Sequence, residues 1–365
     1  MRETSDDYYL IMPISWLEIQ NRIQHVSTAI SCLLNSILIF LILKHSPKKI
    51  GTYKFLMVYI SFFQIFYSIM DVVSLPVYHT VGSVFVVLKD TRGKEYLPWW
   101  AHFVLLVTYA GCYGFSMAIF GIHFYYRYLA ISGKKGLQTF KGCKLAGWLL
   151  IPPTSALIWA VTAGITFRPT EETDAEIANS ILESYDLKLT EIVYIAAFIW
   201  PKDAETGEKF LNVQPALGIA IEELIVISSL SAIFYFGFCC YHKIREHVKV
   251  AVSLSRMTKN LHRQLFYALV MQTAIPIVLL HFPVSGLFVF PMLDRDLGFF
   301  TGFVTITIAV YPAIDPLPTM FVIENYRNAI FAFFTFPLRC KQHREDDKSA
   351  NNNCAVSKSV TFISS

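Results

Sequence analysis

Charged residues are scarce in this sequence. Asp, Glu, Lys and Arg make up 16% of its 365 residues, whereas a soluble domain carries roughly 25%. Hydrophobic residues account for 54% and the mean hydropathy is +0.46, so neutral polar residues do not fill the gap. These figures argue against a water-soluble enzyme. They indicate a chain that hides its apolar surface in lipid.

The usual signals of metal binding and glycosylation are missing as well. The seven cysteines show no spacing such as C-x2-C, and no N-x-[ST] sequon occurs. The vicinal pair Cys239 and Cys240 lies in an apolar run and is expected to be buried and inert. We therefore expect no metal, no cofactor and no N-linked glycan.

Seven segments are long and apolar enough to cross a membrane as helices, which takes about 20 residues each. They are residues 23–43, 53–77, 101–131, 145–166, 216–241, 265–290 and 299–323. The predicted fold class is an all-α membrane protein, a seven-transmembrane helix bundle over residues 23–323. Residues 1–22 show no signal peptide, so the first helix is expected to act as its own insertion signal.

Basic residues favour one side of this bundle. The loops 44–54, 131–144 and 242–264, with the end 324–365, hold 20 Lys and Arg against 5 Asp and Glu. The other side holds 10 basic and 18 acidic residues. Because cytoplasmic loops carry the excess of Lys and Arg, we expect an extracellular N-terminus, 1–22, and a flexible cytosolic tail, 339–365. Every cysteine then lies in a span or in the cytosol, so no extracellular disulfide can form within the chain.

The second extracellular loop, 167–215, is long enough to carry structure of its own. Thr173 and Glu176 match a capping box, and apolar residues at helical spacing follow them. A hairpin is expected next: strand 191–199, turn 201–208 and returning strand 209–213. We interpret the loop as a folded lid over the mouth of the bundle. A loosely ordered acidic loop is the alternative.

A short amphipathic helix is predicted at 324–338, after the last span. Tyr326, Ile330, Phe331 and Phe334 fall on one of its faces, which suits a helix lying on the inner membrane surface. Cys340 just beyond it is a candidate for palmitoylation, with an ordinary free thiol as the equal alternative.

The third span carries a stripe more polar than lipid tolerates, which should face the bundle interior. Its members follow at intervals of three and four residues: Tyr109, Tyr113, Ser116, Phe120, His123 and Arg127. Arg127, at the cytosolic end, could contact a cytosolic partner or extend into the lipid headgroups. The sequence alone favours the headgroups.

Charged and titratable residues inside spans are costly and usually functional. Asp71 and His281 lie at similar depth toward the outer side, so with Tyr109 and Tyr113 they form the predicted ligand-contact set. Glu222 and Glu223 stand near the outer end of the fifth span. Solvation at the membrane surface explains those two glutamates at least as well as ligand contact.

Four strings resemble those of nematode Str-class chemoreceptors, or serpentine receptor class r. They are GTYKFLM at 51–57, HFYYRYL at 123–129, ALVMQTAIP at 268–276 and YPAIDPL at 311–317. They occur in the family's order and on its expected helices, and the resemblance covers about residues 20–335. The family includes the diacetyl odorant receptor, but the resemblance does not transfer diacetyl as the ligand.

The resemblance implies a G-protein-coupled receptor on the sensory cilia of chemosensory neurons, and not an enzyme. Its implied partners are a small volatile or soluble ligand, a heterotrimeric G protein and membrane lipids, with no nucleic acid. The matching strings point to His123, Arg127, Asp315 and Pro316 for activation and G-protein coupling. Compared with rhodopsin-like receptors, Tyr126 replaces the acidic residue before the arginine.

Two other functions are alternatives for a chain with seven spans. A ligand-gated odorant channel of the insect type would have its N-terminus inside, opposite to the charge distribution. A membrane hydrolase would need a zinc site, yet the candidate ligands His102, His123, His281 and Asp71 are scattered along the sequence.

Overall fold

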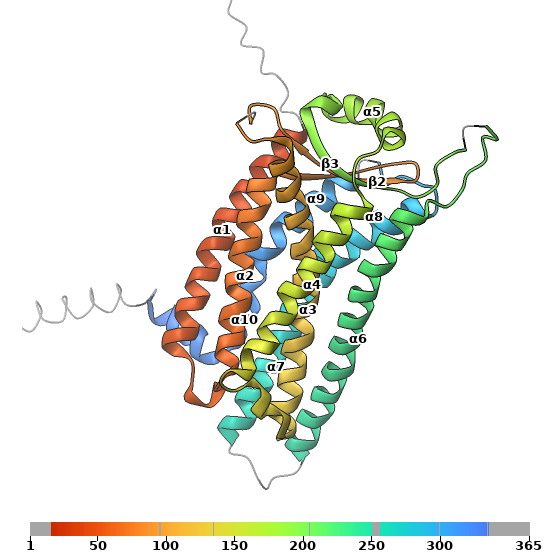
Figure 1. Ribbon diagram of the computed structural model, residues 1–365. Helices are drawn as coiled ribbons and strands as arrows, with labels where there is room; N and C mark the ends of the chain where they lie inside the picture. Colours follow the sequence, from red (N-terminus) through yellow and green to blue (C-terminus); the bar gives the residue numbers. More distant parts are fainter. Residues whose placement is uncertain are drawn as a thin grey trace, which may run out of the picture.

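The computed structural model describes residues 16–333 and residue 335, except 95, 134, 204, 250–255 and 299. Within this part of the chain, seven helices are long and apolar enough to span a membrane. The first five are α1 (Trp16–His45), α2 (Tyr53–Ser74), α3 (Trp99–Ser132), α4 (Lys144–Thr166) and α6 (Val213–Lys249). The sixth joins α7 (Arg256–Pro276), a π-helical turn (Ile277–His281) and α8 (Phe282–Met292), and the seventh joins α9 (Phe300–Ile314) and α10 (Pro316–Val322). The predicted seven-helix bundle is confirmed (Figure 1).

The third helix, α3, packs closely against α4 because small residues face it. A Cβ atom placed on Gly111 would lie 2.7 Å from the carbonyl oxygen of Ala156, and one on Gly114 would lie 3.0 Å from that of Ser155. Membrane helices use such residues to bring their backbones together. This packing fixes α3, which carries most of the predicted site residues.

Proline shapes the seventh span. Pro316 has no N–H group, so the carbonyl of Pro312 four residues earlier loses its helical donor. Two side chains of α1 replace it: Ser31 Oγ and Asn35 Nδ2 each donate to the Pro312 oxygen at 3.1 Å. Buried polar side chains thus tie the first span to the last.

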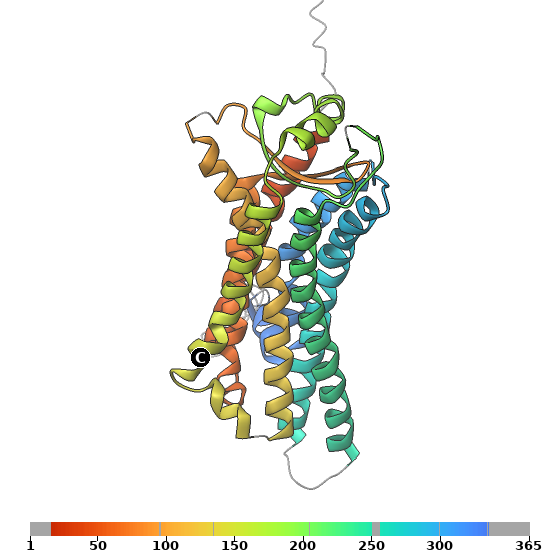
Figure 2. The ribbon, with the colours of Figure 1, turned by 45° about the vertical axis from the view of Figure 1, so that its right-hand side comes forward.

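A three-stranded antiparallel sheet covers one end of the bundle, which we call the sheet end (Figures 1 and 2). Its strands, in spatial order, are β1 (Pro76–Val81), β2 (Val84–Asp90) and β3 (Ile192–Phe198). At the opposite end lie two helical turns, Lys48–Ile50 and Lys135–Phe140.

The prediction missed the β1–β2 hairpin and extended the second span too far, to residue 77. The helix ends at Ser74 because Leu75 adopts a left-handed conformation with φ 43° and Pro76 follows it. A two-residue turn then joins the strands, with Gly82 at φ 52° in the position that favours glycine in hairpins.

The second long loop also differs from the prediction in detail. Its helix, α5 (Glu171–Tyr185), begins earlier, since Thr170 Oγ1 caps it by accepting from the Thr173 amide at 3.2 Å. Strand β3 pairs with β2 of the other loop and not with 209–213. Of the expected returning strand, the described residues form one isolated bridge, between Lys202 and Lys209.

After the seventh span, a helix covers 324–333 beyond a bend at Ile323. Tyr326 is buried and its hydroxyl lies 2.6 Å from Ser46 Oγ, whereas Phe331 is 55% exposed. Two members of the predicted apolar face therefore differ, with Tyr326 in the bundle and Phe331 at the surface, while Phe334 lies outside the described residues. Cys340 lies outside the described residues, and Cys239 is half-buried, unlike the buried Cys240.

Candidate functional site

A cavity of about 40 Å³ lies inside the sheet end. The sheet contributes one part of its wall and α3, α4, α6 and α8 contribute most of the rest. Its lining is Tyr78, Phe85, Val87, Tyr109, Ala110, Tyr113, Trp159, Ala163, Phe167, Ile195, Glu222, Val284 and Phe288. The cavity is therefore mostly aromatic, with a few polar atoms, which is the usual composition of a small-molecule site.

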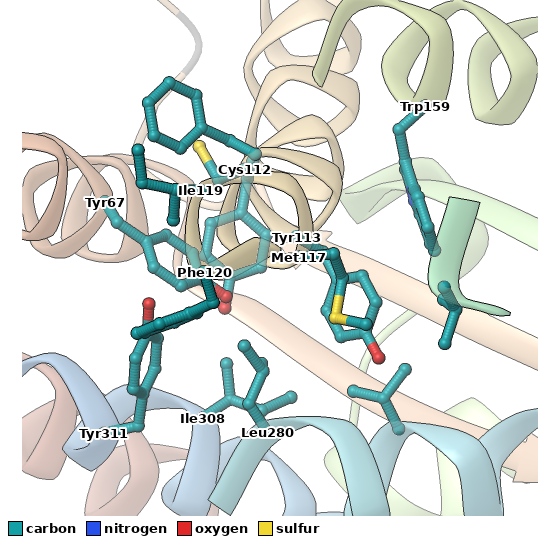
Figure 3. Packing of buried hydrophobic residues seen from close by; sticks show 14 of the residues in the cluster. Tyr67, Cys112, Tyr113, Met117, Ile119, Phe120, Trp159, Leu280, Ile308 and Tyr311 are labelled. Carbon is teal, nitrogen blue, oxygen red and sulfur yellow. The ribbon is translucent and has the colours of Figure 1, made fainter. Parts of the chain in front are cut away.

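The structure brings together two members of the predicted ligand-contact set. Tyr109 and Tyr113, one helical turn apart on α3, both line the cavity. The Tyr113 ring packs 4.8 Å from the Trp159 ring, centroid to centroid. Figure 3 shows part of the buried hydrophobic core around these residues. Tyr113 lies on the side of Trp159, and Tyr67 and Tyr311 lie on the other side.

The other two members of that set do not line the cavity. The ring of His281 packs edge-on against the Tyr113 ring, with 5.2 Å between the ring centroids. Asp71 is buried on α2, where the Tyr109 hydroxyl and the Gln24 amide face it. Among the described residues, neither of its carboxylate oxygens has a partner within normal hydrogen-bond geometry. His281 and Asp71 therefore adjoin the cavity through the two tyrosines.

Glu222 is the polar lining residue that the sequence left undecided. It is only 1% exposed, and its Oε1 atom accepts no hydrogen bond from the described residues. Its neighbour Glu223 is half-buried. Solvation at the membrane surface, which the sequence favoured at least equally, is therefore wrong for Glu222. The signal available in the sequence was a carboxylate pair inside an otherwise apolar run.

Two buried basic side chains fix the sheet to its neighbours. His79 of β1 lies between Ser180 Oγ at 2.8 Å and the Tyr185 hydroxyl at 3.4 Å, both on α5. Burial lowers the pKa of His79 to about 4, although nearby Asp296 acts in the other direction.

Lys89 of β2 holds the end of α2. Its Nζ atom donates to the carbonyl oxygens of Val73 at 2.5 Å and Ser74 at 2.9 Å. A cation at a helix C-terminus satisfies free carbonyls and complements the helix dipole. Burial nevertheless lowers the pKa of Lys89 to about 8.

Arg127 occupies the interior of the opposite end, so its extension into the headgroups is a wrong prediction. The side chain is 2% exposed, and its guanidinium carbon lies 3.5 Å from the centre of the Tyr53 ring. Tyr53 also stacks on Tyr126, and its hydroxyl lies 3.2 Å from His123 Nδ1. Arg127 thus contacts aromatic rings, and the residue before it is Tyr126 instead of an acidic residue. Its Nε and Nη2 atoms have no hydrogen-bond partner among the described residues.

Asp315, in the seventh span, is hydrogen-bonded to the second and sixth spans inside the bundle. Its Oδ2 accepts from Gln64 of α2 at 3.1 Å and from Gln272 of α7 at 2.8 Å. Thr319 in turn donates to Gln272 at 3.2 Å. Oδ1 of Asp315 is buried without a partner among the described residues. Pro316 follows directly and frees the Pro312 carbonyl described above.

The four candidate zinc ligands, His102, His123, His281 and Asp71, do not form one group in the structure. His123 lies beside Tyr53, His281 beside Tyr113, and His102 beside the carbonyl of Lys94 at 3.3 Å. Across the described part of the chain, no three His, Cys, Asp or Glu side chains are grouped to hold a metal ion.

A seven-helix membrane bundle with an aromatic cavity at one end has the architecture of a serpentine receptor. The family model for the serpentine type 7TM GPCR chemoreceptor Str matches residues 20–331. The chain is 32% identical over 314 residues to G-protein coupled receptor str-217 of Caenorhabditis elegans, covering 86% of this chain and 89% of that protein. It is 28% identical over 342 residues to serpentine receptor class r-10 of Caenorhabditis briggsae, covering 92% and 95%. The chain belongs to the Str family of serpentine seven-transmembrane chemoreceptors.

Proposed function

We propose that this protein is a G-protein-coupled odorant receptor. A small extracellular molecule binds in the cavity at the sheet end, and a heterotrimeric G protein is activated at the opposite end. The observation that carries the proposal is the cavity itself, with Tyr109 and Tyr113 in its wall. Chemoreceptor family membership supports the same function.

Orientation is part of the proposal. The sheet end is the extracellular end, because its loops hold 10 basic against 18 acidic residues, whereas the opposite side holds 20 against 5. The N-terminus is then outside and the C-terminus inside. The proposed location is the plasma membrane, in particular the ciliary membrane of chemosensory neurons.

Epitope tags test this orientation. A tag before residue 23 should be reached by antibody on intact cells. A tag after Ser365 should be reached only after permeabilisation. Labelling of the C-terminal tag on intact cells would contradict the orientation and the function built on it.

Activation requires that the ligand bind one arrangement of the helices more tightly than another. The cavity joins α3, α4, α6 and α8 to the sheet, so an occupant touches four spans at once. On α3, the same helix continues from Tyr113 to His123 and Arg127. We assign Arg127, His123, Asp315 and Pro316 to the rearrangement that exposes the G-protein surface.

Calcium or cAMP imaging of cells that express the chain, against an odorant panel, tests the function. At least one small compound should evoke a response that requires the heterotrimeric G protein. A current that appears at once and persists without G protein would instead support the ligand-gated channel. Unchanged agonist potency after separate substitution of Tyr109, Tyr113, Asp71 and His281 would place the binding site elsewhere.

A further inference from the structure

Glu222 is an unusual group for an otherwise aromatic cavity. The residue is 1% exposed and is one of those that line the cavity. It makes no hydrogen bond or ion pair with any residue that the structure describes, and Oε1 is buried without a partner. A buried carboxylate without a partner is costly. A ligand that brings a hydrogen-bond donor to Glu222 therefore makes an interaction that the empty receptor lacks.

The rest of the wall suits a positive charge. Seven of the lining residues are aromatic, and the described lining includes no Lys or Arg. Aromatic faces attract cations through their quadrupole, and rings grouped around a pocket recognise ammonium groups. Glu223, half-buried beside Glu222, places a second acidic side chain in the same region of α6. Carboxylate and aromatic rings therefore favour the same kind of ligand.

We propose that Glu222 and the surrounding aromatic wall form a binding site for a small organic cation, an alkylammonium ion. The ammonium donates to the Glu222 carboxylate, and its alkyl groups contact Tyr113, Trp159 and Phe288. This inference rests on the proposed function, because it gives the chemical class of that receptor's ligand.

The size of the cavity limits the alkyl groups. Its volume is about 40 Å³, and a site of this kind needs roughly 10–15 Å³ for each water molecule. The space therefore accommodates a few heavy atoms without movement of the lining. Short-chain amines fit this limit better than long-chain or aromatic amines.

Binding to purified, full-length receptor in lipid nanodiscs tests the proposal without a G protein. The probes are methylamine, ethylamine and isopropylamine, each compared with the alcohol of the same carbon skeleton. The amines, which are protonated at neutral pH, should raise the thermal unfolding temperature in a saturable manner. The matched alcohols should not.

Variants identify the responsible carboxylate. Glu222→Gln keeps the size of the side chain and removes its charge, so amine affinity should fall by about 30-fold or more, as for other buried charge pairs. Glu223→Gln removes the neighbouring charge and should change affinity much less. Glu222→Asp keeps the charge and should still prefer each amine to its alcohol.

Three results would overturn the proposal: no stabilisation by any of the amines, equal stabilisation by the alcohols, or unchanged amine binding in Glu222→Gln. These results are distinct from failure of the proposed function. A receptor that signals to a neutral odorant but binds no amine refutes only the cation site. A receptor that binds amines as described but never activates a G protein refutes only the proposed function.

Discussion

The two ends of this bundle are held together by different interactions. At the sheet end, backbone hydrogen bonds join three strands, and α5 packs on them through an apolar cluster that includes Ile177 and Ile181. At the opposite end and in the bundle above it, side-chain hydrogen bonds connect the spans, such as those of Asp315 with Gln64 and Gln272. Buried polar atoms without a partner among the described residues occur at both ends, as in Asp71 near the sheet and Arg127 at the opposite end.

This difference suits two different tasks. Apolar packing and paired strands favour one arrangement, because any displacement opens a void or breaks a ladder. Side-chain hydrogen bonds between spans can exchange partners without breaking a ladder, and in a low-dielectric interior each exchange has a large energetic effect. We therefore expect the sheet end to hold the shape of the cavity and the opposite end to change arrangement.

The largest expected effect is at Arg127. Arg127→Ala should abolish the agonist-evoked response at normal surface level, while ligand binding is kept. Arg127→Lys should rescue the response only in part, since a lysine lacks the planar guanidinium that stacks on Tyr53. Imaging at matched surface expression measures both. A wild-type response from both variants would remove Arg127 from the mechanism.

A smaller, local effect is expected at the sheet end. Ile181→Ala leaves a cavity between α5 and the sheet and should destabilise this region by about 2–4 kcal/mol. Leu182→Ala is the matched control, because its side chain is 44% exposed. Hydrogen exchange of the α5 amides should rise in the first variant and stay close to wild type in the second. Equal exchange in the two variants would contradict the apolar contact.

Asp315 tests the polar connection. Asp315→Ala leaves the Gln64 and Gln272 amides without their buried acceptor, so the free energy of unfolding should fall by about 1–3 kcal/mol. Asp315→Asn keeps one acceptor oxygen and should lose less. The unfolding temperatures in detergent should decrease in the order wild type, Asp315→Asn, Asp315→Ala. A higher unfolding temperature for Ala than for Asn would show that the two hydrogen bonds are not stabilising.

His79 gives the smallest effect, a pH dependence. Its pKa is about 4 in the fold, against 6.5 when solvated, so between these values the unfolded region binds a proton that the folded region does not. The contact of β1 with α5 should therefore weaken as pH falls from about 6.5 to about 4. Protection factors of the α5 amides, which correct for the slower intrinsic exchange at low pH, should fall over this range in the wild type. In His79→Gln, which cannot titrate, this acid-dependent loss of protection should be absent.

The sequence predicted the seven spans well because lipid imposes a length and composition on each helix that local reading detects. It predicted the strand at 191–199, which is β3, but missed its pairing with β2, because the two strands lie more than 100 residues apart and such pairing leaves no local signal. It also missed the β1–β2 hairpin. The β-branched run around Gly82 was the available clue. The sheet also fixes the second long loop, because β3 pairs with β2 and the Ala196 amide additionally donates to the Phe167 carbonyl at 2.8 Å.

The candidate site could be predicted from the sequence where helical periodicity determines the direction of a side chain. The spacing of Tyr109 and Tyr113 placed both on one inward face, and the structure puts both on the cavity wall. Periodicity could not show that Arg127 meets Tyr53, because that contact depends on how α2 crosses α3. Nor could it show whether Glu222 faces lipid headgroups or the cavity, since both directions are available near the end of a span.

A paired measurement on two variants tests whether the two ends of the bundle have separate tasks. Agonist binding and G-protein activation are measured side by side for Tyr113→Leu and Arg127→Ala at matched surface level. Tyr113→Leu should weaken binding and shift the dose–response curve without lowering its maximum. Arg127→Ala should leave binding intact and remove the maximum. Equal losses of binding and maximum response in both variants would contradict this separation of tasks.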